Sequence, residues 1–297
     1  MDRHRREARP LSSSLGAAST RTARGVRRAA RSAYRDKELE AGSLAHYDDA
    51  AYYTKTYRKR KDDVAFYVGL AERHGRVLEY GVGNGRLALP AARAGALVTG
   101  VDHSRPMLED FKKCLAAEPK IVRARVKLRR GDMRSVRFGH TFPLVTCPFN
   151  AFLHLYERRD VERFLARVRE HLAPKGVFVF DISNPNAHEL IRDPNRAYFC
   201  PRFRYPRTGD MVRYTERFDY DQARQILFVT MEFLPQGKEH ESWVTPLAHR
   251  QFFPQELEAL LHYNGFAIED VWGDYKRTKF DRYAENIVIS ARARPHR

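Results

Sequence analysis

The sequence predicts an α/β fold, a doubly wound and mostly parallel seven-stranded sheet with an antiparallel β meander inserted late in the chain. Two observations predict it. From about residue 60, short apolar runs alternate with amphipathic stretches, which is typical of a βα repeat. Over about 196–252, apolar and polar residues alternate in runs joined by short turns, which indicates antiparallel strands without intervening helices.

The individual elements follow in order along the chain. The first strand is expected over 76–81, and Gly95 closes the helix after it. A second strand over 97–102 precedes a helix that Ser104 caps and that tolerates Pro106 in its first turn. Strands at 125–133, 142–149 and 176–183 follow, with a helix at 158–174. The meander strands are expected at 211–221, 226–235 and 242–252, and a helix at 254–266 with strands at 267–275 and 285–293 completes the sheet.

Charge is distributed unevenly, and this suggests a boundary near residue 40. The formal net charge is +17, from 54 basic and 37 acidic residues. Residues 1–37 contribute +8 of it, from ten Arg and one Lys against three acids, in a segment without a core pattern. We therefore predict a disordered basic tail over 1–40 and one domain over 41–297. The tail is either an organelle transit peptide or a segment that contacts anionic surfaces.

Composition excludes several classes of protein. No run approaches the roughly 20 consecutive apolar residues that a membrane helix requires, so no membrane span is expected. The three cysteines, Cys114, Cys147 and Cys200, are far apart and form no CxxC pair. We therefore expect neither a disulfide framework nor a bound metal, and a cytoplasmic location is the default. The oligomeric state is not predicted.

Three glycines follow the first strand at alternate positions, in "VLEYGVGNGR" (77–86). Their G-x-G-x-G spacing, over Gly81, Gly83 and Gly85, departs from the dinucleotide fingerprint because Arg86 occupies the third glycine position of that motif. No Lys followed by Ser or Thr is present, so the loop is not a P-loop. Asp102 ends the second strand and is placed to accept hydrogen bonds from ribose hydroxyls. The alternative is a tight turn beside an aspartate that caps a helix.

Together with "VTGVDHS", "RRGDMRSV", "CPFNAFLHL" and "LAPKGVFVFDISNPN", this loop resembles, in order and spacing, the class I S-adenosylmethionine-dependent methyltransferases. The resemblance covers about residues 45–292 and implies a Rossmann-like fold with S-adenosylmethionine as cofactor. It further implies that the loop glycines line the methionine part, that Glu79 orders the loop from beneath, and that Asp102 holds the ribose. Asp132 and Met133 would meet the adenine, unless Asp132 only caps the turn after Gly131.

The stretch after the fourth strand supplies the candidate catalytic residues. Asn150 and His154 are four residues apart, so a helical turn would place both on one face. Here the sequence resembles glycine N-methyltransferases and related enzymes, which implies that Asn150 and His154 contact the substrate and that Phe149 contacts the cofactor. His154 is either a base or orienting group, or a hydrogen-bonded core histidine. Ser183 stands where glycine-methylating enzymes have an arginine, so glycine is a doubtful acceptor.

Residues 45–60 are rich in tyrosine and lie near a basic run. The resemblance implies a lid over the cofactor, in which Tyr52 or Tyr57 places its ring near the sulfonium. Simple packing and base stacking on nucleic acid are the alternatives. In the meander, Tyr214, Trp243 and Arg250 are expected to roof the substrate pocket, with sheet packing and a solvated charge as the alternative.

The predicted function is transfer of a methyl group from S-adenosylmethionine to N or O of a small-molecule metabolite. Nucleic acid is an unlikely substrate because no base-methylating motif follows the fourth strand. The alternative is an RNA-associated methyltransferase or RNA-binding protein that uses the basic tail. A nicotinamide oxidoreductase is disfavoured by Arg86.

Overall fold

In the computed structural model, which describes residues 36–295, the central sheet has the strand order β10-β11-β5-β4-β1-β2-β3. Strands β1 to β5 run parallel, and β11 lies antiparallel between β5 and β10. The strands are Arg76–Tyr80 (β1), Leu97–Asp102 (β2), Val126–Arg130 (β3), Phe142–Cys147 (β4), Leu172–Ser183 (β5), Phe266–Trp272 (β10) and Asn286–Ala293 (β11). The predicted doubly wound, mostly parallel sheet of seven strands is confirmed.

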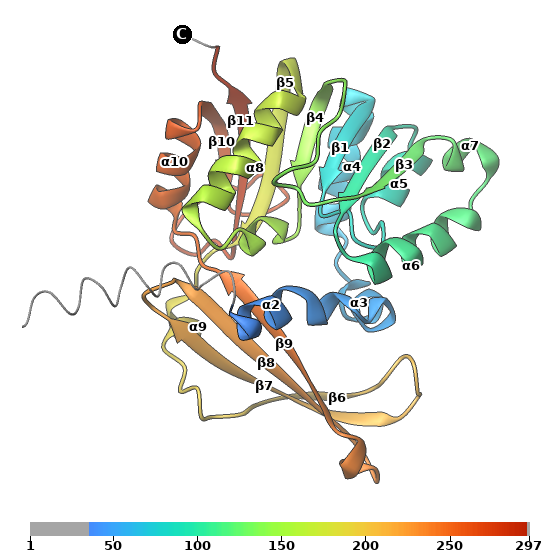
Figure 1. Ribbon diagram of the computed structural model, residues 1–297, viewed down its shortest axis with the longest axis vertical. Coiled ribbons are helices and arrows are strands. Elements are labelled where there is room, and N and C mark those ends of the chain that lie inside the picture. Colours follow the sequence, from blue (N-terminus) through green and yellow to red (C-terminus); the bar gives the residue numbers. More distant parts are fainter. Residues whose placement is uncertain (1–35, 296–297) are drawn as a thin grey trace, which may run out of the picture. The chain divides into compact units, whose positions relative to one another are not determined.

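Helices cover both faces of this sheet (Figure 1). Alternate residues of each central strand belong to different hydrophobic clusters: Leu78 and Tyr80 of β1 pack with α8 and α10, whereas Val77 packs with α4, α5 and α6. Strands buried on both faces explain the near-continuous apolar runs of the sequence. The helices are Asp62–His74 (α4), Ala88–Arg93 (α5), Arg105–Ala116 (α6), Lys120–Arg123 (α7), Arg158–His171 (α8) and Pro254–Tyr263 (α10).

The inserted segment forms a second, antiparallel sheet in the order β6-β7-β8-β9. Its strands are Tyr198–Arg204 (β6), Met211–Asp221 (β7), Ile226–Pro235 (β8) and Trp243–Arg250 (β9). The bounds of β7 and β8 coincide with the predicted ones, and the predicted meander is confirmed. Strand β6 was not predicted. It contains Pro201, which cannot donate to a ladder, and its pairing with β7 shifts register between Cys200 and Phe203.

The chain before β1 is helical, with α2 over Lys37–Leu44, the 3₁₀ helix η2 over Ala45–Tyr47 and α3 over Ala50–Tyr57. The Asp49 side chain caps α3 by accepting a hydrogen bond from the Tyr52 amide at 2.9 Å. In Figure 1, α3 lies between α6 and the second sheet. The remaining short elements are Ala151–His154 (η3), Ala187–Leu190 (α9) and Glu239–Glu241 (η4).

The described residues from Ala41 onward belong to one compact unit. The predicted disordered tail, 1–40, lies outside the described residues except for 36–40. Across residues 36–295, no helix has both the length and the apolar character needed to cross a membrane.

Candidate active site

The glycine loop joins β1 to α5 with three left-handed backbone conformations. The φ angle is 69° at Gly81, 54° at Gly83 and 83° at Gly85. A Cβ at Gly81 would lie 2.6 Å from the Ala151 Cβ, and one at Gly85 would lie 2.4 Å from the Phe111 ring. The loop needs glycine both for its conformation and because η3 and α6 approach it closely. Contact of these glycines with the methionine part of the cofactor stays a prediction.

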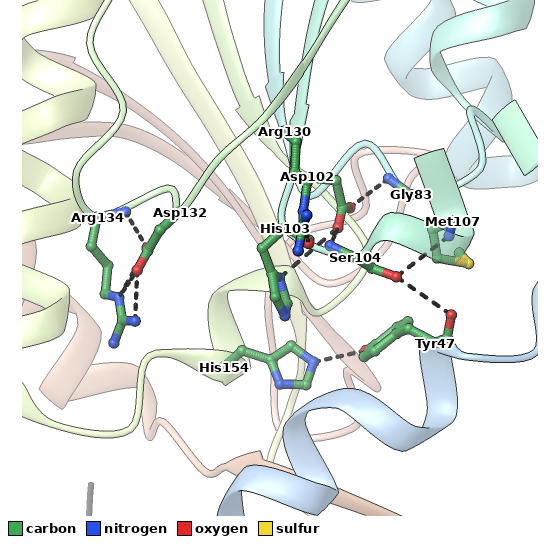
Figure 2. Close-up of polar contacts among 10 residues, drawn as sticks. All are labelled: Tyr47, Gly83, Asp102, His103, Ser104, Met107, Arg130, Asp132, Arg134 and His154. Atoms are coloured by element: carbon green, nitrogen blue, oxygen red, sulfur yellow. Dashed lines mark hydrogen bonds and ion pairs between the residues drawn. The ribbon is translucent and has the colours of Figure 1, made fainter. Parts of the chain in front are cut away.

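Asp102, at the end of β2, holds this loop through its carboxylate (Figure 2). One oxygen, Oδ2, accepts a hydrogen bond from the Gly83 amide at 2.7 Å, and Oδ1 accepts one from the Ser104 amide at 2.8 Å. Burial raises the pKa of Asp102, although both hydrogen bonds favour the carboxylate. A carboxylate can accept about four hydrogen bonds, so Asp102 keeps capacity for the predicted ribose hydroxyls.

Glu79 is buried in β1 directly before the loop. Burial raises the pKa of its carboxyl to about 8, against the opposing effect of the Arg86 charge. Glu79 is therefore mostly protonated at neutral pH and can donate as well as accept a hydrogen bond. Its predicted role in ordering the loop is compatible with this position and stays a prediction.

Arg86, the residue that separates this loop from a dinucleotide fingerprint, ties the loop to α4. Its guanidinium donates two hydrogen bonds to the Asp63 carboxylate, at 3.0 and 2.5 Å, and lies 4.4 Å from the centre of the Phe149 ring. Asp63 is only 2% exposed. A buried carboxylate without a partner is costly, so this pair fixes the start of α4 beside the glycine loop.

Asp132 and Met133 follow β3, as predicted. The Asp132 carboxylate accepts a hydrogen bond from the Arg134 amide at 2.8 Å and forms an ion pair with the Arg134 guanidinium at 2.7 Å (Figure 2). This local hydrogen bond is the turn-capping arrangement given above as the alternative for Asp132. Met133 packs against the large core cluster. Contact of either residue with adenine stays a prediction.

The two lid tyrosines chosen from the sequence face different neighbours. Tyr52 is buried against the second sheet, where its ring stacks on Tyr205 at 5.8 Å. Tyr57 turns toward the end of β4: its ring centre is 4.9 Å from that of Phe149, and its hydroxyl lies 3.1 Å from Nε2 of His46. Of the two rings, only Tyr57 touches a residue beside the glycine loop, and both cofactor roles stay predictions.

Helix α3, part of the predicted lid, is linked directly to the glycine loop. Asn84, between the second and third glycines, donates a hydrogen bond from Nδ2 to the Thr54 hydroxyl of α3 at 2.7 Å. The Oδ1 atom of Asn84 is buried and has no hydrogen-bond partner among the described residues. A buried acceptor without a partner within the protein is available to a donor from water or from a ligand.

Phe149 and Asn150 both have positive φ, 56° and 64°. Asn150 exchanges two hydrogen bonds with Ser183, from Nδ2 to the hydroxyl at 3.1 Å and from the Ser183 amide to Oδ1 at 2.7 Å. His154 ends a 3₁₀ helix instead of the expected α-helical turn. The expectation that Asn150 and His154 share one helical face was therefore wrong, because the left-handed Asn150 breaks the helical period. Their substrate roles stay predictions.

His154 lies between two tyrosine hydroxyls. Its Nε2 is 2.7 Å from the Tyr47 hydroxyl and its Nδ1 is 2.9 Å from the Tyr156 hydroxyl (Figure 2 shows the first). The Tyr156 hydroxyl donates to the Ala248 carbonyl of β9 at 2.9 Å. The His249 ring centre is 5.1 Å from that of His154. Tyr156, Ala248 and His249 were not predicted, because β9 reaches His154 only through the tertiary fold.

His154, His249 and His46 are uncharged at neutral pH. Burial lowers the pKa of His154 well below its ordinary value, and nearby His249, His103 and His46 lower it further. Burial also lowers the pKa of His249 to about 3 and that of His46 to about 4. Among residues 36–295, no group of three or more His, Cys, Asp or Glu side chains is arranged to hold a metal ion.

A buried network around Asp181 of β5 was not singled out by the sequence. Its Oδ1 accepts hydrogen bonds from the Tyr67 hydroxyl at 2.5 Å and the Phe149 amide at 3.0 Å, and its Oδ2 accepts one from the Tyr275 hydroxyl at 2.9 Å. Burial raises the pKa of Asp181, against these hydrogen bonds. The network fixes the strained backbone of Phe149 from three separate elements.

The residues expected to roof the substrate pocket pack within the second sheet and its surroundings. Tyr214 and Trp243 both stack on Phe233, each with ring centres 5.0 Å apart. Arg250 forms an ion pair with Glu256 of α10 at 2.6 Å. For Tyr214 and Trp243 these contacts are those of the packing alternative, whereas the Arg250 side chain is ion-paired and only 13% exposed, so it is not a solvated charge. A role of the three at the substrate stays a prediction.

The strand ends fit S-adenosylmethionine. Asp102 keeps hydrogen-bonding capacity for ribose, and the three glycines of the loop beside it carry no side chain. Asn84 offers an unpaired buried acceptor, which suits an ammonium group. The aromatic rings of Tyr57 and Phe149 lie at the end of β4, and aromatic faces attract a sulfonium cation.

Comparison with known proteins also supports a methyltransferase. Residues 77–176 match a family described as "Methyltransferase domain". The cypemycin N-terminal methyltransferase of a Streptomyces species is 29% identical over 220 residues, which cover 72% of this chain and 81% of that protein. The likeness to glycine N-methyltransferases noted in the sequence is only a loose one within this class.

Solved structures share the fold. The CcbJ methyltransferase of Streptomyces caelestis superposes with a TM-score of 0.70 at 24% identity, over 85% of this chain and 99% of that one. CalS10 of Micromonospora echinaspora, an amino pentose methyltransferase with bound S-adenosylmethionine, superposes with a TM-score of 0.61 at 21% identity, over 82% and 96%. The matched domain, the similar curated protein, the sheet order and the glycine loop together indicate that this chain is a methyltransferase that uses S-adenosylmethionine.

Proposed function

We propose that this enzyme methylates an amine nitrogen of a small natural product or peptide. The observation that carries the proposal is the position of His154 between two tyrosine hydroxyls. Both of its ring nitrogens pair with tyrosine hydroxyls, and burial lowers its pKa well below the ordinary value. His154 therefore offers an acceptor that orients a hydrogen-bond donor, and it is a poor base at neutral pH.

Because His154 is a poor base, amines and hydroxyls differ in how well they can serve as methyl acceptors at this site. When bound, S-adenosylmethionine supplies a methyl group activated by its sulfonium charge. A neutral amine attacks through its lone pair and takes over the positive charge, so no proton has to leave during the transfer. A hydroxyl acceptor has to lose its proton, and that step needs a base with a pKa near the working pH. The His154 site therefore favours an amine that arrives uncharged.

Tyr57 and Tyr47 suit a reaction in which positive charge passes from the sulfonium to the amine. Burial raises the pKa of Tyr57 to about 12 and that of Tyr47 well above its ordinary value, so both remain protonated and neutral. Neutral aromatic rings stabilise the positive charge that the amine acquires during transfer. Because they carry no negative charge, they do not form an ion pair with a protonated amine before transfer. In a buried environment of this kind, the free amine is favoured over the ammonium ion before reaction.

The names of the similar proteins support the same direction. One relative is described as acting on the N-terminus of cypemycin, and one structural neighbour as acting on an amino pentose. The first description names an amino terminus and the second an amino sugar, so each names a molecule that carries an amine. The predicted preference for a small molecule over nucleic acid agrees with these names and is part of the proposal.

A labelling experiment tests the proposal. The enzyme is incubated with S-adenosylmethionine that carries a deuterated methyl group, together with a small-molecule and peptide extract, and labelled products are identified by mass spectrometry. We expect N-methylated products, and a rate that rises with pH until the acceptor amine is uncharged. Parallel incubation with an RNA fraction is expected to give no label. Labelled hydroxyl groups, or label in the RNA alone, would contradict the proposal.

A further inference from the structure

We propose that Tyr156 is a positioning residue that fixes the tautomer of His154, so that Nε2 always carries the lone pair that accepts a hydrogen bond from the Tyr47 hydroxyl. This inference rests on the proposed role of His154. It assigns a part in the active site to the inserted sheet, because the interaction that fixes Tyr156 comes from β9.

The direction of each hydrogen bond follows from the Ala248 carbonyl. A carbonyl oxygen can only accept, so the single proton of the Tyr156 hydroxyl points to Ala248, at 2.9 Å. Toward His154 the same hydroxyl can then only accept, and Nδ1 at 2.9 Å has to carry a hydrogen. A neutral imidazole with a hydrogen on Nδ1 has a lone pair on Nε2. Nε2 therefore accepts from the Tyr47 hydroxyl at 2.7 Å.

The Ala248 carbonyl is itself held in place. Ala248 is fully buried in β9, where it pairs with Phe228 of β8. Gly42 packs against it so closely that a Cβ there would lie 2.7 Å from the Ala248 Cβ and 3.0 Å from its amide nitrogen. The position of the carbonyl is thus fixed by the ladder on one side and by Gly42 on another.

The charged and titratable groups facing His154 do not compete for this tautomer. From η2 come Tyr47 and His46, from β9 comes His249, and from the residue after β2 comes His103; the Asp102 carboxylate acts on Tyr47. Asp102 already accepts from two backbone amides, and His103 lies 3.9 Å from it. Tyr156 is therefore the group whose hydrogen bond determines which nitrogen of His154 carries the hydrogen.

Nitrogen-15 NMR of the full chain, with labelled histidine and no acceptor present, tests the assignment. We expect His154 to show a protonated Nδ1 and an unprotonated Nε2. In Tyr156→Phe, this tautomer loses its partner, and we expect a population with the hydrogen on Nε2 to appear. Turnover by Tyr156→Phe is expected to fall roughly tenfold, as for the loss of one buried hydrogen bond, with unchanged affinity for S-adenosylmethionine.

Two further variants separate positioning from general damage. Tyr47→Phe removes the partner on the other nitrogen and is expected to leave the hydrogen on Nδ1. Tyr263→Phe changes a tyrosine that is 85% exposed and is expected to alter neither the spectrum nor turnover. The inference is overturned by a wild-type His154 with its hydrogen on Nε2, or by a Tyr156→Phe spectrum identical to wild type. The spectrum requires no methyl acceptor, so its result is independent of the acceptor. The tautomer assignment can fail while amine methylation is correct, and amine methylation can fail while the tautomer assignment is correct.

Discussion

Replacing Asp102 by alanine is expected to weaken binding of S-adenosylmethionine by roughly a hundredfold or more. The substitution removes the acceptor of the Gly83 and Ser104 amides, which hold the glycine loop against β2. It also removes the carboxylate predicted to bind the ribose. Hydrogen bonds to a charged group contribute about 1.5–3 kcal/mol each, so losing the two predicted from the ribose hydroxyls corresponds to about 3 kcal/mol or more of binding free energy. Isothermal titration calorimetry measures the change.

Glu109→Ala is the matched control, because Glu109 lies on the adjoining helix α6, is 52% exposed and pairs with the exposed Arg105. This variant should bind as the wild type does. Thermal unfolding of both variants separates loss of the site from loss of the fold. A folded Asp102→Ala protein that keeps wild-type affinity would show that this carboxylate neither holds the loop nor contacts the cofactor.

Gly85→Ala is expected to cost about 3 kcal/mol of the free energy of unfolding. The residue has a φ of 83°, where an L side chain is strained, and its Cβ would lie 2.4–2.6 Å from three atoms of the Phe111 ring. Phe111 is fully buried, so its ring has no free space into which it can move. Denaturant unfolding followed by circular dichroism measures the loss.

The double variant Gly85→Ala with Phe111→Leu tests the cause. If the clash between the new Cβ and the Phe111 ring dominates, the double variant loses less free energy of unfolding than the two single variants together. Gly139→Ala is the matched control, because a Cβ at Gly139 meets nothing within 4 Å and its φ lies outside the left-handed region. Equal effects of alanine at the two glycines would contradict the explanation from close packing.

Periodic elements could be predicted from the sequence with close bounds. Strands β7 and β8 coincide with the predicted 211–221 and 226–235, because apolar residues recur through both runs and polar turns bound each run. Strand β6 lacks this signal, because Pro201 interrupts it and most of its residues are exposed or half-buried. A pattern based on alternation cannot detect a strand that alternates poorly.

The candidate site was predictable only in part. The glycine loop and Asp102 were found because their signals lie close together in the chain. The directions of the tyrosine side chains in the predicted lid could not be predicted. A cluster of tyrosines on a short helix does not show which ring faces the glycine loop and which, like Tyr52, faces the second sheet. The hydrogen bond between Tyr156 and Ala248 joins residues 92 positions apart and leaves no local pattern.

The spacing argument for Asn150 and His154 failed for a physical reason. Four residues correspond to about one turn only in an α-helix, whereas Asn150 is left-handed and the following turn is a 3₁₀ helix. The left-handed pair at Phe149 and Asn150 is stabilised by Asp181, Tyr67 and Tyr275, which come from β5, from α4 and from the segment after β10. Such tertiary support for an uncommon backbone cannot be read from one segment.

Calorimetric titration of the full chain with S-adenosylmethionine and, separately, with NADH tests the central claim most directly, namely that the glycine loop and Asp102 bind an adenosyl sulfonium cofactor. We predict saturable binding of S-adenosylmethionine at one site per chain, and no binding of NADH. Binding of NADH without binding of S-adenosylmethionine would contradict the account.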